Sequence, residues 1–363
     1  MMALTSAQKS AIAHIDSYAS SRKAAALNDI DHLTQMSNIP RPRYEQAVNN
    51  IKQFARVAVH FHPDRPVSDQ QNIVESIFAS GKYLNQFETK VSNGSLTAVS
   101  GGLRDSWEKE VFGGAYHTKG TSLNERPKYG ALNLMLHPDG PSPRFGSCYF
   151  LLNPKVSKRC TFTYMDSHTS PKEKGTLKEL SDLLAAALSE VFTRNFVIGQ
   201  DNITLPKLIS HLCNNLEKTI EISPTKPNGR NLDHYIEAQI HGDIRLENDV
   251  DYLVADPSFK NTHIEENFKA ICKKYAIKLH WHAGFLLNVE DVPLDFRGPG
   301  MPSLAKRIAT NNVFSTNMIG KAAWQLKKNP ELWKDRGSYD EVLQELKLLW
   351  HVLVRFGKPF QGR

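Results

Sequence analysis

Three short segments of this chain supply, in sequence order, a cation, a group of hydroxyls and a carboxylate. They are His60-Phe61-His62-Pro63-Asp64-Arg65, Ser92-Asn93-Gly94-Ser95 and Tyr235-Ile236-Glu237-Ala238-Gln239. An arginine just past a strand end can make forked hydrogen bonds to phosphate or ribose oxygens. Hydroxyls can align a ligand or brace a carboxylate, and a carboxylate can stabilise positive charge that develops during a reaction. Together the segments predict a site for a ligand that carries phosphate and sugar.

The carboxylate segment predicts a strand with one polar face. Glu237, Gln239 and His241 point to one side, and three apolar residues point to the other. Such a face either serves a site or meets solvent at the edge of a sheet, and alternation alone does not separate the two.

The histidine-rich segment also permits a metal site. His60 and His62 alternate to the same face of a predicted strand, and Asp64 lies close by. A catalytic zinc site needs a third protein ligand, and the comparable pair in this chain is His280 and His282. A metal-dependent hydrolase therefore stays open as an alternative function.

The same segment contains His-Pro-Asp, which is typical of chaperone-recruiting J domains. The pattern shows neither the expected Tyr- and Leu-bearing helix before it nor an amphipathic helix directly after it. Taken alone, the segment would indicate a surface arginine and two hydrogen-bonded histidines at a strand end. Its use as a phosphate-binding site depends on the other two segments.

Residues 86–97 predict a strand that runs into an Asn93-Gly94 turn and carries several hydroxyls. Turns recruit hydroxyl residues to satisfy their own backbone, so Ser92 alone does not indicate a site. A glycine- and aromatic-rich middle section follows, in which Tyr116 could stack on a ligand ring. The chain has no P-loop lysine motif, GxGxxG fingerprint or GxSxG elbow, which disfavours phosphate-loop ATPases, Rossmann dehydrogenases and α/β-hydrolases.

The composition is that of an ordinary globular protein. Forty-five basic and 38 acidic residues give a net charge of +7, interspersed along 363 residues, which does not indicate nucleic-acid binding. Four scattered cysteines suit reduced, buried thiols in a cytosolic compartment. We see no cleavable signal peptide and no run of about 18 apolar residues, so we expect no membrane insertion.

Hydrophobic periodicity predicts an α+β protein with helical ends. Residues 1–56 read as helices, 57–290 as a core with a mostly antiparallel sheet and a helical insertion at about 175–220, and 291–363 as helices again. The expected helices span 6–27, 30–36, 44–57, 177–192, 205–216, 302–309, 313–327 and 339–356. The expected strands span 57–61, 86–91, 131–135, 147–152, 161–165, 235–241 and 279–287, while 249–255 fits a helix or a strand.

The three segments, in this order, resemble the Arg-Ser-Glu triad of the ADP-ribosyltransferase superfamily. The stretch from His60 to about Thr262 resembles more specifically a divergent bacterial branch. The shared motifs are His-Phe-His-Pro-Asp-Arg, Gln-Phe-Glu-Thr, Ser-Asn-Gly-Ser-Leu-Thr-Ala, Phe-Gly-Gly-Ala-Tyr, the stretches 126–134 and 142–147, Asp166-Ser167-His168 and Val254-Ala255-Asp256-Pro257-Ser258-Phe259.

This resemblance implies two small sheets that clasp NAD, the substrate, in one cleft. It implies that Arg65 binds phosphate and ribose, with His62 as the alternative, and that Ser92 positions the catalytic Glu237 on the nicotinamide ribose. Asn93, Gly94, Tyr116 and Gln239 would complete the NAD site. Loss of nicotinamide leaves an oxocarbenium-like ribose, whose positive charge a carboxylate stabilises without any metal.

The resemblance also implies a bacterial effector made in the cytoplasm and translocated into a host cell without a cleaved signal peptide. Its acceptor would be a protein arginine, with host NAD-dependent glutamate dehydrogenase as one candidate. Arginine-modifying relatives carry Glu or Gln two residues before the catalytic glutamate, where this chain has Tyr235. Besides the hydrolase, a non-catalytic interaction module on a transferase-like core stays open.

Overall fold

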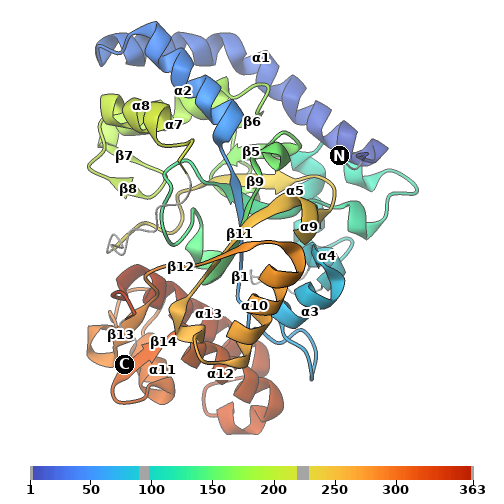
Figure 1. The fold of residues 1–363 in the computed structure, drawn as a ribbon, viewed down its shortest axis with the longest axis vertical. Helices are drawn as coiled ribbons and strands as arrows, with labels where there is room; N and C mark the ends of the chain where they lie inside the picture. The colour runs from blue at the N-terminus through green and yellow to red at the C-terminus, as the bar shows by residue number, and fades with distance from the viewer. Residues whose placement is uncertain (1–2, 90–97, 219–228, 361–363) are drawn as a thin grey trace.

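The structure is a computed structural model that describes residues 3–89, 98–218 and 229–360 as a mixed α/β fold (Figure 1). Its helices are α1 (Ser6–Met36), α2 (Arg41–Phe54), α3 (Ile73–Ser80), α4 (Gln86–Thr89), α5 (Leu103–Val111), α6 (Pro154–Ser157), α7 (Ser181–Arg194), α8 (Leu205–Asn214), α9 (Leu246–Asp249), α10 (His263–Tyr275), α11 (Met301–Ile308), α12 (Thr316–Lys328) and α13 (Tyr339–Phe356). Its strands are β1 (Val57–Phe61), β2 (Lys82–Tyr83), β3 (Lys128–Leu132), β4 (Cys148–Leu152), β5 (Cys160–Tyr164), β6 (Lys174–Thr176), β7 (Phe196–Val197), β8 (Gln200–Asp201), β9 (Ile236–Ile240), β10 (Ile244–Arg245), β11 (Val250–Ala255), β12 (Lys278–Trp281), β13 (Leu286–Asn288) and β14 (Val313–Ser315).

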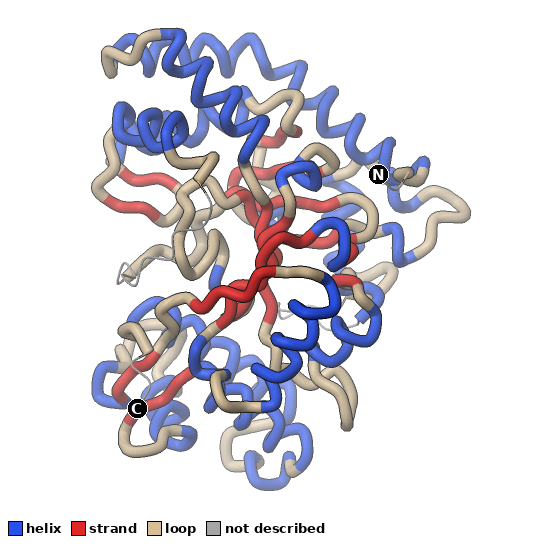
Figure 2. The backbone as a smooth tube through the Cα atoms, in the orientation of Figure 1, coloured by secondary structure: helices blue, strands red, loops and turns tan. Residues whose placement is uncertain are grey.

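Eight strands form one sheet in the order β12-β11-β4-β1-β3-β9-β5-β6, which runs through the middle of the molecule (Figure 2). The pairs are antiparallel except β11 with β12, so the mostly antiparallel sheet is confirmed. The expected pair of small sheets is corrected to a single large one. The reason is that β1 pairs with β4 on one side and β3 on the other, which joins two groups of strands into one hydrogen-bonded array.

The N-terminal helices cover one end of this sheet, together with α7 and α8 (Figure 1). The stretches predicted at 6–27 and 30–36 form one 31-residue helix, because no proline or glycine interrupts them and Thr5 opens the helix with a capping box. Buried residues of α1 and α2 belong to the same large core cluster as the sheet. Within the described ranges, no helix is both long enough and apolar enough to cross a bilayer.

The C-terminal helices gather at the other end of the molecule around a second core cluster (Figure 1). The helix α13 has the predicted bounds, and its apolar stripe, which includes Leu346, Leu349 and Leu353, fills that core. The strand predicted over 279–287 is divided into β12 and β13. Gly284 separates them with a left-handed φ of 72° and donates its N–H to the His282 ring, so the backbone cannot stay extended there.

The strand predicted over 86–91 is wrong where the structure describes it, because Gln86–Thr89 is the short helix α4. Asn85 caps this turn: its side-chain oxygen accepts the N–H groups of Phe87 (2.9 Å) and Glu88 (3.0 Å). The Glu88 carboxylate accepts the N–H of Asn85 in return, at 2.8 Å. This local reciprocal cap outweighs the β-like alternation of the side chains.

Candidate functional site

The strand β9 carries Glu237 into the interior of the large sheet. It lies between β3 and β5, where Glu237 is opposite Ala131 on one neighbour and Thr163 on the other. All five residues of β9 are buried, so the solvated edge strand that the alternation also allowed is excluded. The polar face of β9 therefore faces other protein groups and a pocket.

Glu237 is a buried carboxyl group held by two neighbours. Only 5% of the residue is exposed, and Gln239 Nε2 donates a hydrogen bond to its Oε1 at 2.9 Å. The hydroxyl and the backbone N–H of Ser167 also donate to it. Burial, followed by the nearby charge of Asp166, raises the pKa of Glu237 to about 8, although both hydrogen-bond donors favour the carboxylate. At neutral pH Glu237 is therefore mostly a neutral acid.

A ladder of hydrogen bonds supports this carboxyl group from behind. Gln239 is fully buried, donates to Thr163 Oγ1 (3.2 Å) and accepts from Thr161 Oγ1 (2.9 Å). Gln239 thus braces Glu237 instead of lining a pocket. Further along the same face, His241 meets the hydroxyl of Tyr116 at 2.5 Å. Tyr116 is 2% exposed and packs against α1, so the structure does not bring this predicted NAD contact into the site.

The pocket over Glu237 encloses about 960 Å³, part of it open to solvent. Its walls combine carboxylates, cations and aromatic rings, a set that suits a ligand with charged and planar parts. The lining residues are His60, Tyr83, Gln86, Arg104, Trp107, Tyr129, Gly130, Ser142, Arg144, Phe145, Asp166, Ser167, His168, Glu237 and Lys347.

Three cations in this pocket come from three separate elements. Arg104 on α5 lies over the rings of Trp107 (4.8 Å) and Tyr129 (5.8 Å), and its buried Nε has no hydrogen-bond partner in the described part of the chain. Arg144 pairs with Asp166 at 3.4 Å. Lys347 reaches the pocket from α13 and forms no ion pair with the described residues. Arg144 is also paired with Asp233, so the positive charge that no described carboxylate balances comes from Arg104 and Lys347, and it favours an anion.

The charge around Lys347 is strong enough to change its ionisation. Burial, followed by the charges of Arg144, Arg65, Arg297 and Arg104, lowers the pKa of Lys347 to about 8. The same cluster of positive charge reaches His351, one turn further along α13, whose two buried ring nitrogens have no hydrogen-bond partner among the described residues. A bound polyanion would relieve this repulsion.

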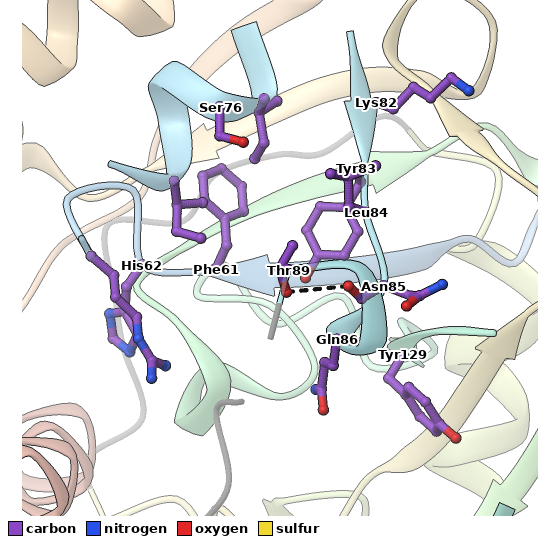
Figure 3. Close-up of a pocket in the computed structure, with 13 residues that line it drawn as sticks. Phe61, His62, Ser76, Lys82, Tyr83, Leu84, Asn85, Gln86, Thr89 and Tyr129 are labelled. Carbon is purple, nitrogen blue, oxygen red and sulfur yellow. Dashed lines mark hydrogen bonds between the residues drawn. The ribbon is translucent and has the colours of Figure 1, made fainter. Parts of the chain in front are cut away.

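Arg65 and His62 line a second pocket of about 670 Å³, also partly open to solvent. Figure 3 shows His62 at one end of this pocket and Tyr129 at the other, with the Phe61 and Tyr83 rings between them. Burial lowers the pKa of Arg65 and brings that of His62 to about 3. His62 therefore stays neutral, and its ring meets Trp350 of α13 edge-on at 5.0 Å.

The expected single cleft is thus corrected to two adjoining pockets, one with Arg65 and one with Glu237. Tyr83, Gln86 and Tyr129 line both, so they form the boundary between the pockets. Gln86 belongs to the short helix α4, where an extended strand was expected.

The predicted Ser92, Asn93 and Gly94 lie outside the described residues. Among those described, the serine that hydrogen-bonds to Glu237 is Ser167, which directly follows Asp166 at the end of β5. The motif Asp166-Ser167-His168 was visible in the sequence, yet its role depends on the pairing of β5 with β9. Arg104 and Lys347 gave no local signal, and Arg144 lay in the 142–147 motif without a predicted role.

His60 lines the Glu237 pocket, but both of its ring nitrogens are already hydrogen-bonded to backbone groups. Its Nδ1 donates to the Gly146 carbonyl at 2.9 Å, and its Nε2 accepts the Ser142 N–H at 3.4 Å. His282 likewise bonds to Ser147 O (2.8 Å) and to a backbone N–H. No cluster of three metal-ligating side chains occurs within the described ranges. The geometry therefore gives the metal-dependent hydrolase no support.

Comparison with known proteins yields one family. No curated protein matched the chain. A family model described as "Protein of unknown function (DUF3626)" matches residues 56–356, which begin just before β1 and end with the last residue of α13. The match includes both pockets and the C-terminal helices. Because it spans most of the 363 residues, this chain belongs to the DUF3626 family.

Proposed function

We propose that this protein is a mono-ADP-ribosyltransferase. It would use Glu237 to cleave the glycosidic bond of NAD and would transfer ADP-ribose to a protein. The observation that carries the proposal is a buried, braced carboxyl group at the base of a pocket whose walls supply cations and aromatic rings. The chain's large antiparallel sheet, with β1 and β9 contributing to one pocket, would be a version of the ADP-ribosyltransferase core.

Glu237 has the properties that glycosidic cleavage of NAD requires. Its raised pKa reflects burial and the nearby charge of Asp166, which disfavour negative charge. The nicotinamide ring of NAD carries a positive charge, and this charge passes to the ribose as the C1′–N bond breaks. A cation next to Glu237 favours the carboxylate, which would then accept the ribose 2′-hydroxyl and stabilise the oxocarbenium-like transition state.

The cations suit the two phosphates of a dinucleotide. Arg104, Arg144 and Lys347 line the same pocket as Glu237, and Arg65 lies in the adjoining one. We place the nicotinamide ribose at Glu237 and the adenosine end toward Arg65, with the phosphates near the shared wall. Tyr129, fixed by a 2.6 Å hydrogen bond to Glu108, offers a rigid ring at that wall.

Lys347 provides a test of this placement. Lys347→Met should raise the KM for NAD about 10-fold, which corresponds to about 1.4 kcal/mol, because one charge contact to phosphate is lost. The loss should shrink at high salt, since screening already weakens the wild-type contact. The matched control is Lys321→Met on the exposed side of α12, which should leave KM unchanged. Equal KM values for all three proteins would exclude Lys347 from the NAD site.

Ser167 gives a test through pH. Its two hydrogen bonds favour the ionised form of Glu237, so Ser167→Ala, which removes the hydroxyl, should raise the pKa of Glu237 further above about 8. Transfer needs the carboxylate, so the rise of kcat/KM with pH should move to higher pH, with about a 10-fold loss at neutral pH. The measurement is kcat/KM for NAD between acidic and alkaline pH. An unchanged pH profile would mean that Ser167 does not act on Glu237.

The acceptor in this proposal is an arginine of a host protein, reached after the effector is translocated from a bacterium. Incubation with host-cell lysate and NAD labelled in the adenylate phosphate should produce a labelled protein band, and the Glu237→Gln variant should produce none. Purified NAD-dependent glutamate dehydrogenase is the first acceptor to test. Release of nicotinamide without labelled protein would leave an NAD hydrolase, and neither product would reject the proposed function.

A further inference from the structure

A second pair of ionisable side chains lies in the Glu237 pocket and has no part in holding NAD. Asp166 lies just after β5 and caps the short turn η4 (Ser167–Thr169). Its carboxylate accepts the His168 N–H at 3.1 Å. The Asp166 carboxylate also meets His168 Nδ1 at 2.7 Å. Both side chains line the pocket beside Glu237.

Asp166 is kept ionised, in contrast to Glu237. Burial opposes its ionisation, but hydrogen bonds from the Tyr235 hydroxyl (2.7 Å) and from His168 outweigh burial and lower the pKa of Asp166. Arg144 adds a positive charge at 3.4 Å. The pocket therefore holds one neutral and one ionised carboxyl group, an arrangement that separates two chemical roles.

The ring of His168 is held in an orientation suited to proton transfer. The short contact with Asp166 places the proton on Nδ1, which leaves Nε2 with a free lone pair. Nε2 makes no hydrogen bond with any residue in the described ranges, and 49% of the side chain is exposed. The Trp107 ring lies beside it, with centroids 6.2 Å apart. The free nitrogen is thus accessible to a second substrate that enters the pocket.

Tyr235 does not supply such a base. Tyr235 stands two residues before Glu237, and its hydroxyl is buried and committed to Asp166. It is therefore not available to remove a proton from an incoming nucleophile. Through this hydrogen bond it instead stabilises the carboxylate that orients His168.

We propose that His168 is the general base that deprotonates the acceptor, with Asp166 as its positioning residue. The proposal rests on the proposed function. The C1′–N bond of NAD breaks and its electron pair leaves with nicotinamide, which becomes neutral. A nitrogen of the acceptor guanidinium forms a bond to C1′ and gives up one proton to His168 Nε2. The products are the ADP-ribosylated guanidinium, nicotinamide and protonated His168, which then releases its proton to water.

The test separates chemistry at the acceptor from cleavage of NAD. His168→Ala should lower the rate of transfer at least about 100-fold, within the range of general-base catalysis. Binding of NAD should stay within about 2-fold of the wild-type affinity, because Glu237 and the cations are retained. Added imidazole should restore transfer in His168→Ala, since the half-exposed side chain leaves an accessible space in the pocket wall. The control His32→Ala removes an exposed histidine of α1 and should behave as wild type, with no effect of imidazole.

Transfer by His168→Ala at the wild-type rate would overturn the proposal, and so would a loss that imidazole does not restore. Asp166→Asn provides the second variant: it should lower kcat for transfer while NAD binding and folding are preserved. If wild-type protein neither binds NAD nor labels any acceptor, the proposed function fails and this inference fails with it. If wild type transfers and His168→Ala does too, only the inference fails.

Discussion

Glu237→Gln is expected to lower the rate of ADP-ribose transfer by about 10²- to 10³-fold, in line with the loss of a preorganised electrostatic group. The amide keeps the size of the side chain and can still bond with Ser167, but it cannot become a carboxylate when NAD arrives. The measurement is transfer of adenylate label from NAD to protein. Glu247→Gln, on the exposed surface of α9, is the matched control and should retain wild-type activity.

The same variant should also change how the folding stability depends on pH. The folded-state pKa of Glu237 is about 8, above its ordinary value of 4.5, so its contribution to stability is fully present below pH 4.5 and is lost as pH rises through 8. Glutamine does not titrate. The wild type should therefore lose more stability than Glu237→Gln between pH 6 and about 9. Full activity in Glu237→Gln, or a variant that fails to fold, would contradict the role assigned to this residue.

Arg126→Met is expected to destabilise the protein by about 3–5 kcal/mol, because it leaves a buried carboxylate without its cation. Arg126 bonds to Glu108 at 2.9 Å and to Asp105 at 2.5 Å, and the Glu108 side chain is fully buried. Glu108 also accepts the 2.6 Å hydrogen bond from Tyr129, so the wall between the two pockets depends on this pair. Urea unfolding followed by circular dichroism measures the effect.

An exposed ion pair of the same chemistry provides the control for Arg126. Arg41 and Glu45 pair across one turn of α2 with most of both side chains in water, so Arg41→Met should cost less than about 1 kcal/mol. Adding Glu108→Gln to Arg126→Met should recover part of the lost stability, since the unpaired charge is then removed. Equal unfolding midpoints for Arg126→Met and Arg41→Met would show that the buried pair contributes no more than a surface pair.

Local patterns predicted much of the fold because they report on single elements. The alternation over 57–61 and the heptad-like stripe over 339–356 each produced an element with the predicted bounds. Predictions were wrong where a local cap competed with the pattern, as at Asn85, or where a single glycine redirected the chain, as at Gly284. The single sheet was not predictable, because it depends on β1 pairing with two strands that are distant in sequence.

In the candidate site, too, local patterns predicted some residues, and contacts distant in sequence determine the others. The polar face of β9 was visible in the sequence, where alternation alone fitted a site and a solvated edge equally well, and the structure places Glu237 in a pocket. Arg104, Arg144 and Lys347 belong to separate elements and carry no shared spacing, so only the tertiary packing of α5, α13 and the turn that carries Arg144 brings them to one pocket. The role of Asp166 and His168 likewise depends on β5 lying next to β9. These parts of the site depend on contacts between residues far apart in the sequence, which local residue spacing does not reveal.

The most direct test of the central claim is calorimetric titration of NAD into the Glu237→Gln variant, which should bind NAD without consuming it. We expect one NAD per chain with an affinity within the ordinary range of enzyme substrates, about 1 μM to 1 mM. Binding should weaken when Lys347→Met is added. Absence of binding heat at about 1 mM NAD in both the variant and the wild type would contradict the assignment of these pockets to a dinucleotide.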